Sequence, residues 1–480
     1  MNAPLRRVAI SVLVLFTLLI VNVNVIQVVR SDELRSDGRN TRVLVEEYDS
    51  ERGSIVAGGT EIASSVPTDD QLTYLRQYAN GPVFAPVTGY YSLVYGNAQM
   101  ERAADDVLSG DDARLFTRRL ADLFTGRDPA GGDVVLTLDP AVQDTAMAGL
   151  EGVTGAVVAL DPSTGAVLGM ASTPTYDPNQ LSSHEPAAIR DYAAQLDGRE
   201  VDPRLNRAIN ARYEPGSIFK VVVSAAALSS GQYTPDTVIP APQELVLPGT
   251  RTALENFGGS ACDPSGRQSL LEALTISCNT AFAQLGIDLG EDRVREMAEA
   301  FGIGGDPLEI PLPVSESTLG EIETDAALGV SSIGQQDVQL TPLQAAMIAS
   351  AVANDGTLMS PYLVDQVRAP DLSVIDQTDP EELSEPVSAD VADQLTEMMT
   401  SVVENGSGRR ARIPGVTVAG KTGTAENAGP DHNWFIGFAP ADDPQIAVAV
   451  FVANGGGTGG DVSAPIARDV MQAYLDGQGG

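Results

Sequence analysis

Two lysines occur in the 480-residue sequence, Lys220 and Lys421, while the other strongly basic side chains are arginines. A crowded ammonium can lose its proton near neutral pH and act as a base, whereas a guanidinium stays charged. Lysine at these two positions alone therefore suggests that arginine will not serve there. If Lys421 lies near Lys220, it also lowers the pKa of Lys220. The alternative is that a lysine-poor, acidic composition left two lysines by chance.

Ser217 stands three positions before Lys220, at the start of an apolar segment. Residues 218–228 are almost wholly apolar and predict a buried helix that ends at Gly231. A serine in the first turn lies beside free backbone N–H groups and the positive end of the helix dipole, which favour an attacking oxyanion. Lys220, one turn along on the same face, can accept the serine proton if it is neutral. The alternative, a surface serine and lysine, fits an apolar helix poorly.

The tripeptide Ser277-Cys278-Asn279 follows a predicted helix over residues 270–275. A serine hydroxyl can relay a proton, and an asparagine amide both donates and accepts, so that it can hold a peptide bond. Taken alone, a polar loop with a helix cap is the simpler interpretation. Cys262 and Cys278 form either one disulfide or two buried free thiols.

A third segment contains Lys421, Thr422, Gly423 and Thr424 on a predicted edge strand. A lysine flanked by threonines can hold a carboxylate, and Gly423 leaves room for a substrate against the strand. The backbone N–H of Thr424 would complement that of Ser217 as an oxyanion hole. The segment therefore predicts a binding site for an acidic group beside the nucleophile.

The elements that must position these residues are mainly strands. Residues 418–424, 433–439 and 445–452 have the apolar pattern of strands in one antiparallel sheet. Apolar runs on both sides of the turn at 161–165 predict a hairpin over 156–171 within a sheet. We expect the nucleophile helix to lie against this sheet.

The remaining segments give weaker predictions. Residues 74–96 read as short strands and turns, and residues 99–123 as a helical stretch. Proline in the first turn predicts a helix over 140–150. The acidic residues 371–390 predict a solvated loop.

An uncharged stretch covers residues 8–29 and follows Arg6 and Arg7. At about 1.5 Å per residue it is long enough to span a bilayer core of about 30 Å. It lacks a small-residue cleavage site, which predicts an uncleaved anchor. The arginine pair favours a cytoplasmic N-terminus, so that the chain is a single-pass membrane protein with an extracytoplasmic catalytic part.

Composition excludes some function classes. The formal net charge of −36 and the isoelectric point near 4.2 argue against nucleic acid as a partner. The 43% of hydrophobic residues is typical of a globular chain, and the length suggests two to four domains. His184, His432 and the two cysteines lack the spacing of a zinc site, so we expect no metal and no cofactor.

In combination, the motifs resemble those of penicillin-binding proteins and serine β-lactamases. The order along the chain is Ser217-x-x-Lys220, Ser277-x-Asn279 and Lys421-Thr422-Gly423. The contexts at residues 160–165, 213–217, 333–344 and 420–426 are similar to class B penicillin-binding proteins. Residues 84–102 are similar to the actinobacterial penicillin-binding protein A group.

The resemblance implies an α+β fold of the penicillin-binding transpeptidase and β-lactamase type. Such a fold has a five-stranded antiparallel sheet flanked by helices, an all-helical subdomain, a small N-terminal accessory domain and one transmembrane helix. The expected division is 1–30 for the anchor, 31–150 for the accessory domain and 151–480 for the transpeptidase domain.

The resemblance also implies a D,D-transpeptidase that cross-links peptidoglycan stem peptides. Ser217 would attack the penultimate D-alanine carbonyl and form an acyl-enzyme, which a neighbouring amine resolves. Lys220 would act as the base, Ser277 would pass the proton to the leaving amine, and Asn279 would bind the acyl-side peptide.

The substrate's terminal carboxylate would bind at Lys421, Thr422 and Thr424, and β-lactams would acylate the same serine. The region before the hairpin is too short for a glycosyltransferase domain with a linker, so a SEDS-type polymerase is the expected partner. Alternatives are a D,D-carboxypeptidase, which shares every motif, and a β-lactam-binding sensor or scaffold without turnover. A β-lactamase is disfavoured because nothing marks a deacylating glutamate.

Overall fold

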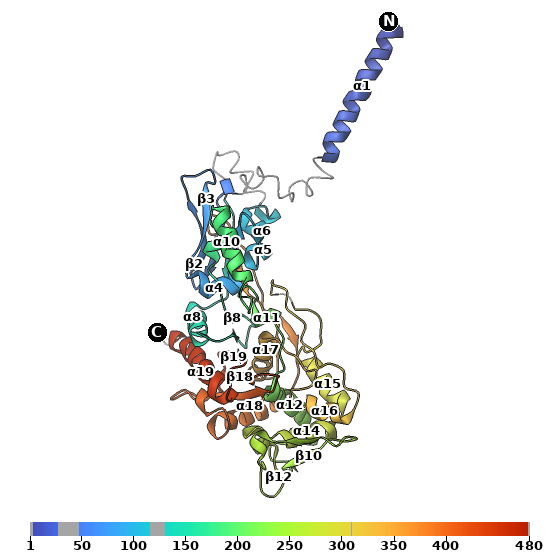
Figure 1. The fold of residues 1–480 in the computed structure, drawn as a ribbon, viewed down its shortest axis with the longest axis vertical. Helices are drawn as coiled ribbons and strands as arrows, with labels where there is room; N and C mark the ends of the chain where they lie inside the picture. Colours follow the sequence, from blue (N-terminus) through green and yellow to red (C-terminus); the bar gives the residue numbers. More distant parts are fainter. Residues whose placement is uncertain (1–2, 27–47, 116–129, 309, 479–480) are drawn as a thin grey trace.

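The computed structural model describes residues 3–26, 48–115, 130–308 and 310–478 (Figure 1). Outside the N-terminal helix, the described chain is organised around two sheets. One sheet carries the third motif on an edge strand and lies beside the helices that carry the first two, and the other sheet belongs to the accessory region.

The first sheet has five antiparallel strands in the order β17-β18-β19-β7-β8. Its bounds are β7 (Gly155–Leu160), β8 (Val167–Thr173), β17 (Ala419–Ala425), β18 (His432–Ala439) and β19 (Ile446–Val452). The hairpin and the three later strands are therefore confirmed. Because β17 is at the edge of this sheet, the segment that contains Lys421 is free to face another element.

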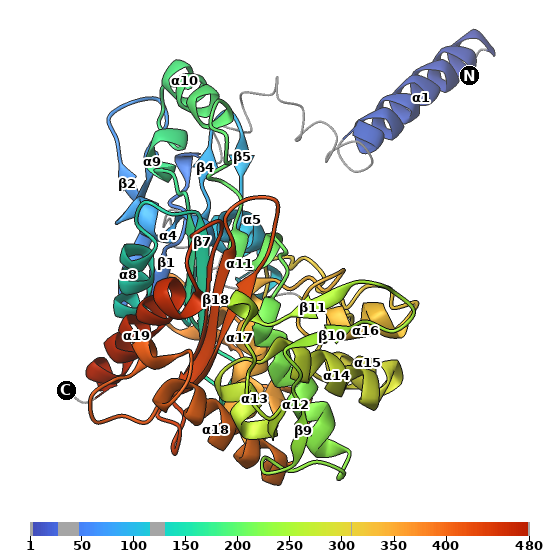
Figure 2. The same cartoon turned by 60° about the horizontal axis from the view of Figure 1, so that its bottom comes forward.

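Both faces of this sheet are covered. Helices α8 (Pro140–Gly149) and α19 (Gly459–Gln478) lie on one side of the strands, and α17 (Pro342–Ala353) lies on the other (Figure 2). Successive side chains of a strand point to opposite faces, so Val157 packs with the α8 and α19 side and Val158 with the larger core. This double coverage explains why these strands are almost continuously apolar.

Further helices gather beside the sheet and form the helical subdomain (Figure 2). They are η3 (Gly216–Phe219), α12 (Lys220–Ser229), α13 (Leu270–Thr275), α14 (Asn279–Leu289), α15 (Glu291–Ala300), α16 (Asp325–Ser331) and α18 (Ala389–Glu404). The short turn η5 (Arg409–Ala411) packs against α19. Between α12 and α13 lie short segments, namely β9 (Val238–Pro240), β10 (Glu244–Val246), β11 (Ala253–Glu255), η4 (Phe257–Gly259) and β12 (Arg267–Ser269). The helix predicted over 270–275 is confirmed.

The second sheet has six strands in the order β15-β14-β6-β1-β2-β3. They are β1 (Ile55–Ala57), β2 (Thr60–Pro67), β3 (Tyr74–Tyr78), β6 (Asp133–Leu136), β14 (Val364–Arg368) and β15 (Val374–Gln377). Strands β1 and β6 pair in parallel, and the other neighbours pair antiparallel. The chain therefore returns to the accessory sheet long after residue 150.

The predicted loop over 371–390 is wrong in part. Strand β15 forms the edge of the accessory sheet, and β16 (Glu382–Ser384) pairs with β13 (Leu358–Met359). Edge strands often carry charged, solvent-facing residues, so this acidic stretch has the composition of a loop although it pairs.

Two predictions in the accessory region need correction. Residues 74–96 contain α4 (Gly81–Thr88) in addition to strands, because proline at the second helical position suits a helix start. The single helix predicted over 99–123 is interrupted in its described part, where Gly110 adopts a φ of 82° and ends a short helix. The described segments here are β4 (Tyr91–Ser92), β5 (Gly96–Asn97), α5 (Met100–Ala103), α6 (Asp105–Ser109) and η2 (Ala113–Leu115). Residues 116–123 lie outside the described chain.

Three helices lie between β8 and η3 in the chain, namely α9 (Pro178–Leu181), α10 (Pro186–Asp197) and α11 (Arg207–Asn210). At the N-terminus, α1 (Ala3–Asn24) contains the segment Arg6–Asn24, which is long and apolar enough to cross a membrane. Residues 27–29 of the predicted anchor lie outside the described residues.

Candidate active site

Ser217 lies in η3, a tight turn that continues directly into α12. The turn is held by a hydrogen bond from Gly216 N to Gly334 O at 2.9 Å. A Cβ on Gly216 would lie 2.6 Å from Thr424 O, and one on Gly334 would lie 2.0 Å from Gly216 O. Gly216 also has a φ of 55°, which favours glycine. These glycines therefore let three backbone segments meet at the nucleophile turn.

Strand β17 packs against the same turn. A Cβ on Gly423 would approach Pro215 O to 2.7 Å, so this strand position also requires glycine. From the neighbouring strand, Trp434 Nε1 donates a hydrogen bond to Glu214 O at 2.9 Å. The edge of the sheet is thus fixed beside Ser217.

Lys220 is fully buried and reaches the second motif. Its Nζ donates to Ser277 O at 2.8 Å and to Asn279 Oδ1 at 2.7 Å. The same Nζ lies 3.3 Å from Ser277 Oγ. The second motif therefore surrounds the Lys220 amine with neutral oxygens.

Lys421 completes the cluster from the other side. It is also fully buried, and its Nζ donates to Ser277 Oγ at 2.8 Å and to Thr422 O at 2.9 Å. Ser277 adopts a left-handed φ of 65°, which is uncommon outside glycine. One serine hydroxyl thus contacts both lysines, which belong to motifs 201 positions apart in the sequence.

Burial controls the electrostatics of this cluster. Within the described residues, neither lysine has a carboxylate within ion-pair distance, and both contact neutral oxygens. Burial lowers the pKa of Lys220 well below its ordinary value, and the charge of Lys421 lowers it further. Burial alone lowers the pKa of Lys421 to about 7. A neutral amine is therefore available at neutral pH.

The second motif is tied to the loop in front of it. Cys262 and Cys278 form a disulfide with a Cα–Cα distance of 5.9 Å. Thr280 N donates to Asn256 Oδ1 at 3.0 Å, and Asn279 Nδ2 donates to Glu255 O at 3.4 Å. The segment before the motif is therefore joined to it by one covalent bond and two hydrogen bonds.

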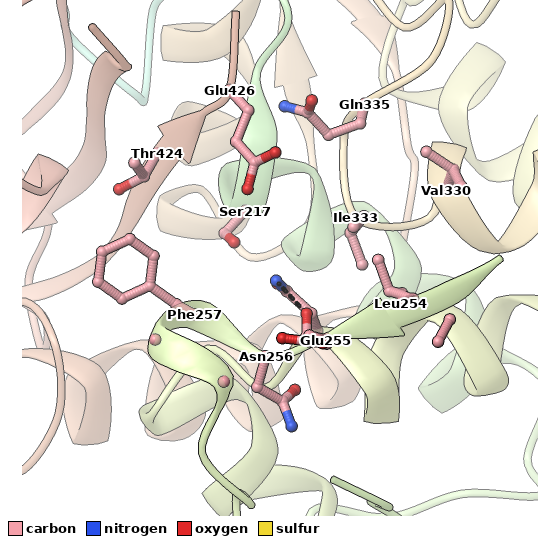
Figure 3. Close-up of a pocket in the computed structure, with 14 residues that line it drawn as sticks. Ser217, Leu254, Glu255, Asn256, Phe257, Val330, Ile333, Gln335, Thr424 and Glu426 are labelled. Atoms are coloured by element: carbon pink, nitrogen blue, oxygen red, sulfur yellow. Dashed lines mark hydrogen bonds between the residues drawn. The ribbon is translucent and has the colours of Figure 1, made fainter. Parts of the chain in front are cut away.

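A cavity of about 700 Å³ opens above the cluster (Figure 3). Among the predicted residues, Ser217, Asn279 and Thr424 line it. Lys220 and Lys421 have no exposed surface and lie beneath its lining. The arrangement places a hydroxyl at an open pocket with proton-accepting groups behind it.

Thr422 is placed differently from its neighbours. It is 5% exposed, and its Oγ1 lies 2.6 Å from Ser407 Oγ. Thr424 Oγ1 accepts a hydrogen bond from Gly459 N at 3.3 Å. The two threonine hydroxyls are therefore both held by protein groups, while only the Thr424 side chain belongs to the lining of this pocket.

Sequence reasoning assigned no role to four further residues that line the pocket: Glu255, Phe257, Gln335 and Glu426. Gln335 Nε2 is buried without a hydrogen-bond partner in the described structure. Phe257 is 68% exposed. Glu426 could have been noticed because only Thr424 and Ala425 separate it from the third motif, whereas Glu255 has no such signal.

The chain was compared with known families and structures. The model described as "Penicillin binding protein transpeptidase domain" matches residues 155–472, and that described as "Penicillin binding protein A dimerisation domain" matches residues 52–134. The peptidoglycan D,D-transpeptidase PbpA of Mycolicibacterium smegmatis is 50% identical over 489 residues, which cover 99% of each chain. PbpA of Mycobacterium tuberculosis strain H37Rv is 48% identical over the full length of both chains.

Solved structures of penicillin-binding protein A from M. tuberculosis are also similar. Its ceftriaxone acyl-enzyme complex has a TM-score of 0.88 and 47% identity, covering 90% of this chain and 100% of that one. Its penicillin G acyl-enzyme complex has a TM-score of 0.86 with 47% identity, covering 89% and 100%.

Proposed function

This chain belongs to the penicillin-binding protein transpeptidase family, and on that premise we propose that Ser217 is the residue that becomes acylated. The protein is a peptidoglycan D,D-transpeptidase that β-lactams inhibit. The observation that carries the assignment is a pair of contacts: Nζ of Lys220 and Nζ of Lys421 both contact Ser277 Oγ. The two lysines are buried, whereas Ser217 lines the pocket. Such a cluster supplies the neutral base that a serine nucleophile needs.

In the proposed acylation, the Ser217 oxygen attacks the carbonyl of the penultimate D-alanine while neutral Lys220 accepts the hydroxyl proton. The bond from this carbonyl carbon to the nitrogen of the last D-alanine then breaks. Lys220 returns its proton through Ser277 to the leaving amine, which departs as D-alanine. The contact of Lys220 Nζ with Ser277 Oγ at 3.3 Å supports this route.

The oxyanion of the tetrahedral intermediate would be bound by the backbone N–H groups of Ser217 and Thr424. The close approach of the Gly216 turn to Thr424 O supports this pairing. Asn279 would bind the acyl-side peptide through the pocket face of its amide.

The terminal carboxylate of the substrate would bind on β17. Lys421, when protonated, supplies positive charge beneath the pocket, and Thr424 supplies the adjoining polar surface. Gly423 leaves that surface clear. Thr422 contributes through its hydroxyl contact with Ser407, which holds this part of the strand in place.

The division into an anchor (1–30), an accessory domain (31–150) and a transpeptidase domain (151–480) is part of this proposal. Segment Arg6–Asn24 supports a single membrane anchor. We place the catalytic part outside the cytoplasm, and we propose a SEDS-type glycosyltransferase as the partner that supplies glycan strands. Strands β14 and β15 would belong to the accessory domain although they lie within 151–480.

Labelling of the full chain in detergent with a fluorescent penicillin tests the assignment. The wild type is expected to form a covalent adduct, and Ser217→Ala is expected to form none, while Ser230→Ala, at the C-terminal cap of α12, labels normally. Mass spectrometry of the tryptic adduct should place the label on Ser217. Equal labelling of Ser217→Ala and the wild type would refute the assignment.

A further inference from the structure

The charged side chains among the described residues that line the pocket are two carboxylates, Glu255 and Glu426. Glu426 follows β17, on the wall that carries Thr424, and Glu255 is the last residue of β11 on the facing wall (Figure 3). Both side chains are exposed. In contrast, the two lysines are buried below the lining. Negative charge therefore lies at the mouth, and the proton-accepting amines lie underneath.

Neither carboxylate is neutralised within the described chain. The hydrogen bonds and ion pairs of the described residues assign no partner to the carboxyl oxygens of Glu255 or Glu426, and no described arginine or lysine belongs to the pocket lining. Two unpaired carboxylates facing one cavity attract a cation from solvent.

Glu255 is also held in place relative to the second motif. Its backbone oxygen accepts a hydrogen bond from Asn279 Nδ2 at 3.4 Å, and the disulfide between Cys262 and Cys278 joins the segment that follows β11 to the second motif. These contacts hold the backbone from which the Glu255 side chain extends to the pocket lining. This is the property required of a specificity-determining group.

Transpeptidation brings substrates of opposite charge to this pocket. The donor ends in a carboxylate, whereas the acceptor is an aliphatic amine with an ordinary pKa of about 10.4 and arrives as an ammonium. We propose that Glu426, assisted by Glu255, binds this ammonium and so selects amine acceptors over water at the acyl-enzyme. The inference rests on the proposed function of Ser217.

The resulting step balances without further reagents. The acceptor ammonium releases one proton to solvent, and its nitrogen then attacks the ester carbonyl of acylated Ser217. The bond from the carbonyl carbon to the Ser217 oxygen breaks, and the second amine proton reaches that oxygen through Lys220. The two glutamates remain ionised throughout, because they bind the cation and transfer no proton.

The test measures how the acyl-enzyme divides between an acceptor peptide with a free amine and water, using a stem-peptide donor and mass spectrometry of the products. Glu426→Gln is expected to lower the ratio of cross-linked to hydrolysed product about two- to fivefold, the effect of one exposed charge pair. The double variant Glu255→Gln/Glu426→Gln should lower it further. Glu426→Asp, which keeps the charge, should retain most of the ratio.

Three comparisons separate binding of a cation from a general loss of structure. In Glu426→Gln, the rate at which the acyl-enzyme reacts with hydroxylamine, a neutral nucleophile, should fall less than its rate with the peptide amine. Acylation by an anionic penicillin should become faster in this variant, because one repelling charge is removed. Both differences should shrink at high salt. Glu151→Gln, which removes an exposed carboxylate outside the pocket lining, should leave all rates unchanged.

An unchanged product ratio in the double variant would overturn the inference, and so would equal losses for the amine and for hydroxylamine. Neither result would affect the proposed nucleophile. Failure of the proposed function would instead appear as the absence of any penicillin adduct on wild-type Ser217.

Discussion

Among the residues that the structure describes, two clusters of buried charged groups stand out, and they are built in opposite ways. In the accessory region, the Glu101 carboxylate accepts hydrogen bonds from Arg76 Nε at 2.6 Å and from Arg52 Nε at 2.7 Å. In the site, Lys220 and Lys421 are buried as deeply, and their described hydrogen-bond partners are neutral oxygens. The first cluster therefore compensates its charges, and the second does not.

The pKa values follow from this difference. Burial raises the pKa of Glu101, but the two arginines outweigh it and hold this pKa below its usual value, so the carboxylate stays ionised. Burial lowers the pKa of both lysines, with no anion nearby to restore it. A buried carboxylate paired with two arginines is suited to a structural role. A buried amine without a nearby anion, beside a pocket, is suited to proton transfer.

The largest effect is expected from placing a permanent positive charge in the lysine cluster, which tests whether acylation needs a neutral amine there. Lys220→Arg keeps a cation but removes the proton acceptor, so we expect penicillin acylation to fall about 10²- to 10⁴-fold, the usual contribution of a general base. The second-order rate constant with a fluorescent penicillin measures this. The thermal unfolding midpoint of the variant shows whether it is folded.

A folded Lys220→Arg protein that acylates at the wild-type rate would show that the amine is not the base. The lysine pair would then be only a costly packing arrangement, and the contrast with the Glu101 cluster would have no catalytic meaning.

The next largest effect is expected in the other cluster. Glu101→Gln leaves Arg52 and Arg76 buried beside a neutral amide, and removing one partner of a buried ion pair costs about 3–5 kcal/mol. Urea unfolding of the full chain in detergent measures the loss, while acylation should remain. The control is Asp105→Asn, which removes an exposed partner of Arg52 and should cost less than about 1 kcal/mol.

Equal destabilisation by the two variants would mean that Glu101 acts as an ordinary surface carboxylate. The buried ion pairs of Glu101 would then not stabilise the fold more than an exposed pair does, and this side of the comparison would fail.

Much of the site could be predicted because its signals are local. The apolar run after Ser217 and the strand pattern around Lys421 each indicate an element by themselves. The placement of Lys220 beside Ser277 follows from the combination of motifs, because a buried lysine requires polar partners. The close contact of these segments depends on the glycines at 216, 334 and 423, whose need is visible only in the folded chain.

The rest depended on contacts between distant segments. Strand β14 pairs with β6, which lies more than 220 residues earlier in the chain, and β15 pairs with β14. The sequences of β14 and β15 are largely polar and do not alternate apolar and polar residues as a typical strand does. Glu255 lines the pocket at the end of β11, where its backbone oxygen contacts Asn279 Nδ2 of the second motif. Neither placement leaves a local trace in the sequence.

The smallest expected effect is a difference in pH dependence between the two clusters. Lys421 has a folded-state pKa of about 7 against an ordinary value of 10.5, so between these values the unfolded chain binds a proton that the folded chain lacks. Its contribution therefore makes the free energy of unfolding rise with pH in this window, by up to about 1.4 kcal/mol per pH unit. Glu101 has a lowered pKa, so its stabilisation is present above the unfolded-state pKa and is lost as the pH falls through the folded-state pKa.

Unfolding measured from pH 7 to 10 for the wild type, Lys421→Met and Glu101→Gln separates these contributions. Lys421→Met should remove the Lys421 share of the rise, because no proton is left to bind at this position in the unfolded chain. Lys220, whose pKa burial also lowers, should keep its own share. Glu101→Gln should keep the wild-type slope at a lower absolute stability, because Glu101 is ionised in both states throughout this range. If Lys421→Met kept the full wild-type slope, the lysine would be charged in the folded protein, and the two clusters would not differ in the way that their contacts imply.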